Sequence, residues 1–292
     1  MNLLELFVEV DDFVQKFEGW AARQQLLGKA KRGPKPSLSV SEVMTLVIHF
    51  HQAGYRDFKR YYQKHVCEHL TAEFPGLVSY GRFVELTKSV LLPLCAYLQS
   101  RFGRCTGTAF VDSTPLAVCH NRRINRNKVF GGLATCGKTS MGWFYGFKLH
   151  LIVNDQGELL AVHLTPGNVD DRKPLEGMTG NLLGKLFGDK GYISQAIFEK
   201  LHERGLELIT SLRKNMKARL MPLADRILLR KRFIIETIND QLKNISQIEH
   251  TRHRSPTNFA VNLIAGLVAY TLQPKKPSIR LPQQLLQLPA LI

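Results

Sequence analysis

The spacing of apolar residues changes near Arg104, and no other feature of the sequence constrains the fold as strongly. Before that point, apolar side chains recur every three or four residues, which is the period of an amphipathic helix. After it, apolar and polar residues alternate, as in a strand that buries one face. We therefore expect an all-α N-terminal domain followed by a domain built on a β-sheet.

Four helices are predicted in the N-terminal region. The first carries an apolar stripe formed by Leu3, Leu4, Phe7, Val10, Phe13, Val14 and Phe17. A basic connector over residues 29–36 leads to a second helix, which opens at the capping box Ser39–Glu42 and stops at Gly54. Another helix follows at once, and the last begins at Ser79 and runs to Leu98.

The charge of the chain points to a polyanionic partner. Lys and Arg number 40 against 24 Asp and Glu, a net charge of +16, which favours nucleic acid as the partner. The helix after Gly54 mixes cations with aromatics, namely Arg56, Lys59, Arg60, Tyr61, Tyr62 and Lys64. We expect Arg56, Lys59 and Arg60 to contact double-stranded DNA in a helix-turn-helix-like domain, although a helical bundle without DNA function has the same pattern.

Two features of the sequence indicate the cellular compartment of the protein. Its most apolar segment, residues 259–272, is too short to span a bilayer, and the N-terminus is acidic rather than signal-like. The five cysteines include no Cys-x-x-Cys pair, which argues against a zinc ribbon and against a disulfide framework. We expect a soluble cytoplasmic protein without a membrane partner, with reduced and mostly buried thiols.

Two aspartates follow short apolar runs with the pattern of strands. Asp112 ends the run Thr108-Ala-Phe-Val, and Asp189 follows Leu186-Phe-Gly and precedes a glycine turn. A carboxylate at the end of a strand is a ready metal ligand. Taken alone, the pattern favours Asp112 as the start of an Asx or Ser turn before Pro115 rather than as a ligand.

A hairpin is predicted between the two acids. Residues 147–153 alternate, 154–157 form a turn signal, and alternation resumes over 160–164, so His150 and His163 are polar-face residues rather than ligands. Further elements follow, with Asp171 as the N-cap of a helix to Met178, a helix over 193–204 and a strand over 206–212. Three strands in a meander, then alternating helix and strand, is the order of an RNase H-like α/β domain with a mixed sheet and flanking helices.

A third acid, Glu236, lies on a predicted helix. At about 100° per residue, one face holds Arg232, Glu236, Asn239 and Lys243, and the other holds Ile234, Ile235, Ile238, Leu242 and Ile245. An exposed ladder of ion pairs has the same spacing. In a basic chain with two acids at strand ends, the pattern favours a carboxylate held between cations at the edge of the sheet.

Three converging acids suit phosphodiester chemistry. Carboxylate oxygens bind Mg²⁺ or Mn²⁺, and two such ions about 3.5–4 Å apart can activate the attacking oxygen and stabilise the leaving one. The candidates for holding DNA near the site are Arg232, Lys243, Asn239 and Lys190.

These residues resemble the DDE transposases of bacterial insertion sequences. The resemblance rests on Asp112, Asp189 and Glu236, with Asp-Lys-Gly-Tyr at 189–192 and Arg-x3-Glu-x6-Lys at 232–243. The helical first hundred residues, Val-Asp-Ser-Thr-Pro at the first acid and Phe-Gly-Asp-Lys-Gly-Tyr at the second are most similar to the insertion-sequence family numbered nine-eight-two. The resemblance implies that the three acids are catalytic and bind two Mg²⁺ or Mn²⁺ ions per active site.

Two features depart from the pattern of these transposases. Many relatives carry a Tyr three residues before the motif Arg, where this chain has Leu229. Only 47 positions separate Asp189 from Glu236 (236 − 189), so there is no room for the large β-rich insertion of some relatives. A hairpin mechanism built on that insertion is therefore not expected.

The resemblance also implies a domain plan and an activity. Residues 1–103 would form the DNA-binding domain, 104–273 the RNase H-like catalytic domain and 274–292 a tail. The enzyme would cut transposon terminal inverted repeats to free a 3′-hydroxyl and join it to target DNA, as a homodimer or larger assembly associated with the bacterial nucleoid. Two alternatives are an RNase H-like nuclease without strand transfer and a non-catalytic DNA-binding protein derived from a transposase.

Overall fold

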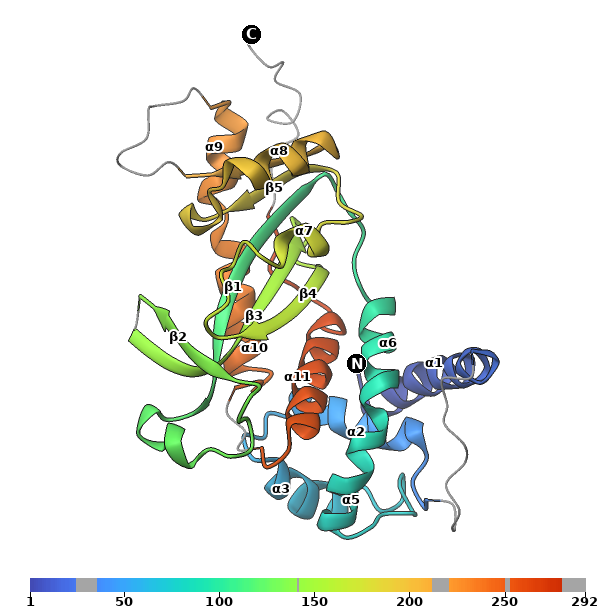
Figure 1. Ribbon diagram of the computed structural model, residues 1–292. Coiled ribbons are helices and arrows are strands. Elements are labelled where there is room, and N and C mark those ends of the chain that lie inside the picture. Colours follow the sequence, from blue (N-terminus) through green and yellow to red (C-terminus); the bar gives the residue numbers. More distant parts are fainter. Residues whose placement is uncertain (25–35, 141, 212–220, 250–252, 280–292) are drawn as a thin grey trace. The chain divides into compact units, whose positions relative to one another are not determined.

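The computed structural model describes residues 1–24, 36–140, 142–211, 221–249 and 253–279 (Figure 1). The chain divides into two compact units. The helical unit comprises residues 1–101 and 241–274, and the sheet unit comprises residues 102–240 and 275–292. Residues 29–35 of the predicted connector and 280–292 of the predicted tail lie outside the described residues. The functional plan of residues 1–103, 104–273 and 274–292 stays a prediction.

The helical unit confirms the predicted all-helical N-terminal region. Its α-helices are α1 (Leu3–Arg23), α2 (Val40–Gln52), α3 (Phe58–Arg60), α4 (Cys67–His69), α5 (Tyr80–Leu86), α6 (Leu91–Ser100) and α11 (Pro256–Thr271). The π-helical segment η1 (Tyr61–Val66) joins α3 to α4, and the 3-10 helix η2 (Thr87–Val90) joins α5 to α6. The helix predicted from Ser79 is therefore formed by three consecutive helical segments.

Helix α2 begins and ends where the sequence predicts. The Ser39 hydroxyl accepts a hydrogen bond from the Glu42 N–H at 3.1 Å, and the Glu42 carboxylate accepts one from the Ser39 N–H at 2.6 Å. These bonds satisfy N–H groups that the start of a helix leaves without partners. Gly54 follows the end of the helix with a φ of +72°, a conformation that glycine adopts without strain. Helix α2 packs against α1 and α11.

Two aromatic residues predicted at a DNA-contacting surface lie in the core instead. Tyr61 and Tyr62 are fully buried. The Tyr61 hydroxyl donates to the Leu46 carbonyl at 3.1 Å, and the Tyr62 ring stacks on Phe83 with centroids 4.4 Å apart. Burying large rings that find a hydrogen-bond partner stabilises the helical unit more than exposing them would. The neighbouring cation Lys59 is exposed.

The described part of the sheet unit contains a six-stranded mixed sheet. Its strands are β1 (Thr108–Cys119), β2 (Thr135–Thr139), β3 (Gly142–Asn154), β4 (Leu159–Pro166), β5 (Gly184–Gly188) and β6 (Leu206–Thr210). Their order is β2-β3-β1-β5-β6, and β4 also pairs with β3. Strands β1, β3 and β4 form an antiparallel meander, while β5 runs parallel to both β1 and β6. The mixed sheet with flanking helices confirms the predicted RNase H-like arrangement.

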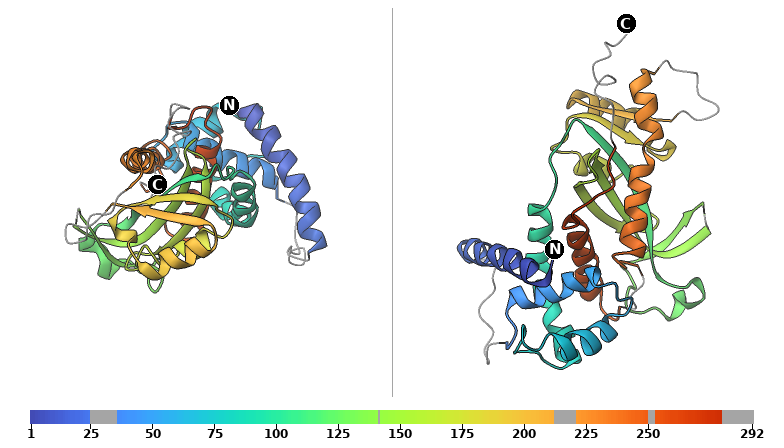
Figure 2. Two further views of the ribbon diagram at one scale, coloured as in Figure 1. Left: turned by 90° about the horizontal axis from the view of Figure 1, so that it is seen from above. Right: turned by 180° about the vertical axis from the view of Figure 1, so that it is seen from behind.

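Short helices connect and flank these strands. They are the 3-10 helices η3 (Asn121–Arg126) and η4 (Lys190–Tyr192), and the α-helices α7 (Leu175–Met178), α8 (Gln195–Glu203), α9 (Leu223–Arg230) and α10 (Phe233–Asn244). Figure 2 shows α9 and the start of α10, in orange, following one another alongside the sheet. The helix predicted from Asp171 is regular only from Leu175, because the preceding residues form turns.

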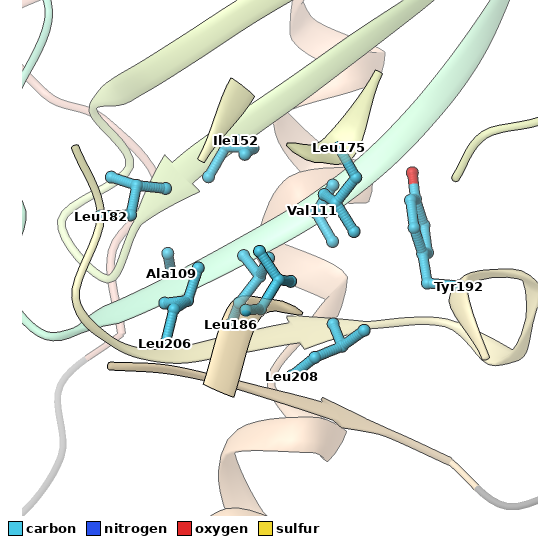
Figure 3. Close-up of a cluster of buried hydrophobic side chains, with 10 residues drawn as sticks. Ala109, Val111, Ile152, Leu175, Leu182, Leu186, Tyr192, Leu206 and Leu208 are labelled. Atoms are coloured by element: carbon cyan, nitrogen blue, oxygen red, sulfur yellow. The ribbon is translucent and has the colours of Figure 1, made fainter. Parts of the chain in front are cut away.

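One hydrophobic core fixes β1 against β5 and β6. Alternate residues Ala109 and Val111 of β1 meet Leu186 of β5 and Leu206 and Leu208 of β6 (Figure 3). Side chains from the flanking segments, namely Leu175, Leu182, Tyr192 and Leu201, complete this cluster. Because Val111 and Leu186 are almost fully buried, the register of β1 on β5 is strongly specified.

The strands differ from the prediction in two respects. Strand β1 does not end at Asp112 but continues to Cys119, with Pro115 opposite Lys148 of β3. Strand β2 lacks an apolar alternation and was not predicted. Its residues, Thr135–Thr139, pair with residues 142–146 of β3. The strand is therefore formed by backbone hydrogen bonds and has no side-chain pattern by which it could be predicted.

Candidate active site

Asp112 and Asp189 occupy equivalent places on adjacent strands. Strands β1 and β5 pair in parallel with Phe110 opposite Phe187, and the aspartates lie two residues further along each chain. Strand β5 ends at Gly188. Strand β1 continues to Cys119, so Asp112 lies inside the strand, contrary to prediction. It nevertheless lies just beyond the last residue pair between β1 and β5.

Two side chains from the α10 region hold Asp112. The Asn239 side-chain amide donates to Asp112 Oδ2 at 3.1 Å, and Arg232 Nη1 lies 3.9 Å from Asp112 Oδ1. Burial raises the pKa of Asp112 to about 6, and the charges of Asp189 and Glu236 add to the rise, while Arg232 and the Ser113 N–H oppose it. Asp189 and Glu236 therefore both lie near enough to Asp112 for their charges to act on it.

Arg232 connects the first and third acids. Its Nη2 lies 2.9 Å from Glu236 Oε1, one helical turn further along the chain. The Glu236 side chain is 56% exposed, whereas those of Arg232 and Asp112 are 22% and 21% exposed. The guanidinium therefore bridges a half-exposed carboxylate and a largely buried one.

The two faces of α10 are largely as predicted. Its apolar face is buried at Ile234, Ile235, Ile238 and Leu242. Asn239 is only 7% exposed because its amide faces Asp112. Ile245 differs from the prediction: it follows the last helical residue, Asn244, and is 55% exposed.

The turn after β5 holds Asp189 in place. Asp189 Oδ1 accepts a hydrogen bond from the Gly191 N–H at 2.7 Å and caps η4. A Cβ on residue 191 would lie 2.8 Å from the same oxygen, so any side chain there would displace the Asp189 carboxylate from this position. Lys190 lies between them with an exposed side chain.

One ion pair beside this region could not be read from local sequence. Lys148 Nζ lies 2.9 Å from Asp171 Oδ1 and donates to the Val169 carbonyl at 2.9 Å. Lys148 belongs to β3 opposite Pro115, and Asp171 was predicted only as a helix N-cap. The charges of Asp112, Asp171 and Asp189 all raise the pKa of Tyr192, after burial as the main cause. Asp171 therefore lies near the same region as the two aspartates.

The donor chemistry of the three acids fits a hard divalent cation. Asp112, Asp189 and Glu236 supply carboxylate oxygens, the ligands that Mg²⁺ and Mn²⁺ prefer. Within the described residues, however, no three His, Cys, Asp or Glu side chains lie close enough together to hold a metal ion. The Arg232 guanidinium pairs with two of the three carboxylates, so a cation at this place would compete with it.

The other predicted DNA-contacting residues lie in the helical unit. Lys243 pairs with Glu249 at 3.2 Å. Arg56, Lys59 and Arg60 are exposed. The first two, together with His51 and Asn262, line a cavity of about 850 Å³.

The histidines and cysteines form no chemical centre in the described chain. His150 is buried, its Nε2 lies 2.8 Å from the Thr165 hydroxyl, and burial lowers its pKa to about 4. All five cysteines are free, as predicted, but none is buried, and Cys95, Cys105 and Cys136 are exposed. The expectation of mostly buried thiols is therefore wrong.

No helix in the described part of the chain is long and apolar enough to cross a membrane.

Comparison with known proteins identifies the family. No curated protein matches the sequence significantly. The family described as transposase DDE domain matches residues 102–256, more than half of the chain and all three acids. The chain belongs to the DDE transposases and is a transposase-type protein whose substrate is DNA.

Proposed function

We propose that this transposase cleaves DNA at the ends of its element and joins the freed 3′-hydroxyl to target DNA. The proposal is supported by the surroundings of Asp112: Asp189 follows the paired strand β5, and Arg232 lies between Asp112 and Glu236. In this proposal, the three carboxylates hold two Mg²⁺ or Mn²⁺ ions, which would supply Lewis-acid stabilisation of the attacking and leaving oxygens. Membership of the insertion-sequence family numbered nine-eight-two is part of the same proposal.

The neighbouring residues have separate roles in this proposal. Asn239 orients Asp112 through its amide hydrogen bond and so fixes which carboxylate oxygen faces the substrate. Arg232, together with Lys190 and Lys243, positions the phosphate backbone. Arg232 can do so because its guanidinium presents several donors in a fixed plane, whereas each lysine provides a mobile point charge.

DNA recognition is assigned to the helical unit. Arg56, which precedes α3, and Lys59 and Arg60 within it lie close together in sequence and are exposed, so they can neutralise successive phosphates. In this proposal the unit binds the terminal inverted repeat and two protomers bring two ends together. Replacing all three cations by Ala in the full-length protein should weaken end binding, and unchanged binding would remove these residues from the interface.

The central test replaces each acid by its amide. Asp112→Asn, Asp189→Asn and Glu236→Gln should each reduce Mg²⁺-dependent cleavage of an end duplex to background, because the ligand charge is lost while shape is kept. DNA affinity, measured by fluorescence anisotropy, should remain near wild type. Glu176→Gln is the matched control, because this carboxylate is exposed, belongs to the same unit and pairs only with Lys200 among the described residues.

Strand joining is measured in the same series with a pre-cut end that carries a 3′-hydroxyl and a supercoiled plasmid. Joined products that disappear with each acid variant support the transposase reaction. Cleavage without any joining would instead support the nuclease. Cleavage that survives one of the substitutions would remove that acid from the reacting site.

A further inference from the structure

A strongly basic surface lies on the sheet unit, outside the three acids. Between Asp112 and Asp155 the sequence contains no Asp or Glu. The segment of residues 120–140 together with Trp143, here called the basic arm, carries five exposed cations: Arg122, Arg123, Arg126, Lys128 and Lys138. Among the described residues, none of these cations forms an ion pair with a carboxylate. Their charge is therefore available to a polyanion.

The basic arm is a folded element. Phe130 is 2% exposed, and its ring packs edge-on against Phe147 of β3 at 5.8 Å. The Tyr145 hydroxyl donates to the Phe130 carbonyl at 3.4 Å, and the Phe130 N–H donates to Asn127 Oδ1 at 3.3 Å. A buried aromatic anchor with exposed cations around it presents charge in a fixed arrangement, so little conformational entropy is lost on binding.

Trp143 is the other unusual residue of the arm. It stands at the start of β3, its side chain is 63% exposed, and its carbonyl accepts a hydrogen bond from the Asn121 side chain at 2.7 Å. Lys138 of the paired strand β2 lies 5.6 Å from the centre of its ring. Figure 1 shows the β2 end of this hairpin extending beyond the strands around β1.

The neighbours of Trp143 decide what kind of partner it suits. A large exposed ring commonly marks a protein interface, but Lys138 over the ring and the four other cations of the same arm disfavour an apolar protein surface or a second copy of the same arm. Nucleic acid satisfies both features, since its phosphates pair with the cations and its bases stack on aromatic rings. In a continuous duplex the base faces are covered by their neighbours, so a stacking ring needs an unpaired or displaced base.

We propose that the basic arm is a second DNA-binding site of this transposase, in which the cations hold the backbone and Trp143 stacks on an unpaired base. The proposal rests on the function proposed above, because it assumes that the substrate is a DNA end. The register gives its position: Trp143 precedes Leu151, the partner of Asp112, by eight residues of β3. At about 3.4 Å per residue this is roughly 27 Å, or about eight base pairs of DNA.

The two tryptophans of the chain make a direct test feasible. In Trp20→Phe the sole remaining tryptophan is Trp143, so its fluorescence reports contact with DNA at the arm. The probes are an end duplex with one unpaired base about eight pairs from the cleaved phosphate and the same duplex fully paired. We expect the duplex with the unpaired base to quench Trp143 fluorescence strongly and the fully paired duplex to quench it less. Fluorescence anisotropy should show that the protein is equally saturated with DNA in both measurements.

Two results would overturn the stacking role. Trp143 emission that stays constant while anisotropy shows bound DNA excludes contact between the ring and a base. Equal quenching by the paired and unpaired duplexes excludes a requirement for an unpaired base.

The role of the cations is tested with two double variants, each of which removes two positive charges. Arg122→Ala/Arg126→Ala should weaken DNA binding and make the plot of log affinity against log salt shallower by about two, since each phosphate contact contributes roughly 0.9. The control Lys200→Ala/Arg226→Ala removes two cations from other helices of the same unit and should leave the slope unchanged. Identical slopes for the two variants would overturn the backbone role.

The failures of the two proposals are distinguishable. Asp112→Asn should retain the Trp143 signal while losing cleavage. If the arm inference fails, cleavage depends on Asp112 but the Trp143 signal is absent. If the catalytic proposal fails, cleavage is independent of Asp112 or absent in the wild-type protein, while the Trp143 signal remains.

Discussion

At the scale of single residues, Asn239 has the most informative environment. Its amide donates to Asp112, while its own Oδ1 is buried and has no hydrogen-bond partner in the described structure. A buried acceptor without a partner costs free energy, so this side chain is retained at the expense of stability. Its geometry suits the orientation of Asp112 rather than the packing of α10.

Replacing this residue separates orientation from stability. Asn239→Ala should lower Mg²⁺-dependent cleavage by about 10–100-fold, the usual effect of removing a residue that orients a metal ligand, with little change in DNA affinity. Single-turnover cleavage at varied Mg²⁺ is the measurement. Thr237→Ala is the control, because among the described residues its hydroxyl donates only to the Phe233 carbonyl of the same helix. Wild-type rates for Asn239→Ala would show that the hydrogen bond has no role in the reaction.

The elements that carry the three acids were predictable from sequence, because each acid stands in a short, locally recognisable pattern, while their catalytic role stays a prediction. Asp112 and Asp189 follow apolar runs, and Glu236 shares a helical face with Arg232 and Asn239. The pair formed by Lys148 and Asp171 was not predictable, because it joins a strand to a turn 23 residues later. This ion pair forms only because of the path that the chain takes after β4, and the spacing of apolar and polar residues does not predict that path.

At the scale of elements, the end of β5 is closely packed. A Cβ at Gly188 would lie 3.2 Å from Val111 and from the Tyr192 ring, so the strand, the core and the turn that holds Asp189 meet at this glycine. Few side-chain atoms can be added here without moving β5 away from β1.

Gly188→Ala should therefore destabilise the protein by about 1–3 kcal/mol, as overpacking of a core typically does, and should reduce cleavage by displacing Asp189. Thermal unfolding and the cleavage assay measure the two effects. Gly177→Ala is the control, since nothing lies within 4 Å of an added Cβ there, and it should be neutral or slightly stabilising. Equal melting temperatures for the two variants would contradict the tight packing.

The boundaries of helices and strands show where a local sequence pattern is enough to predict the structure. The start of α2 follows from side chains within four residues of one another, Ser39 and Glu42, so it was predicted correctly. Pro115 suggested a turn, yet it lies inside β1. It is tolerated there because, in the described structure, β1 pairs with β5 only as far as Phe110, and a residue without an N–H breaks no ladder on that open side.

At the scale of the whole molecule, two buried and two half-buried histidines set the response to acid. Burial lowers the pKa of His49, His51, His150 and His253 to about 4. In the unfolded chain these groups take up protons near pH 6.5, so the unfolded state binds more protons between pH 6.5 and 4, and stability falls as the pH falls. The raised pKa of Asp112 acts in the opposite direction over the same range.

His51 provides the test of this behaviour. It is 4% exposed, and its Nδ1–H donates to the Ser246 carbonyl. At pH 5 its contribution to acid destabilisation is about 2 kcal/mol. His51→Leu should lower the melting temperature at pH 7 but flatten its decrease between pH 7 and 5, whereas His69→Gln, at an exposed site, should leave the slope unchanged. A slope in His51→Leu equal to wild type would exclude His51 as a source.

The helical unit is assembled from two separate stretches of chain, and this has a consequence during synthesis. Helices α2 and α6 pack against α11, which begins at Pro256. About 170 residues must still be made after α6 before α11 is complete, which takes roughly 10–30 s at ordinary translation rates. During that interval the apolar surfaces of α2 and α6 that α11 covers in the folded protein have no partner helix on the ribosome. A ribosome-bound chain arrested near residue 240 should therefore recruit chaperones that bind apolar segments, and release them once α11 emerges.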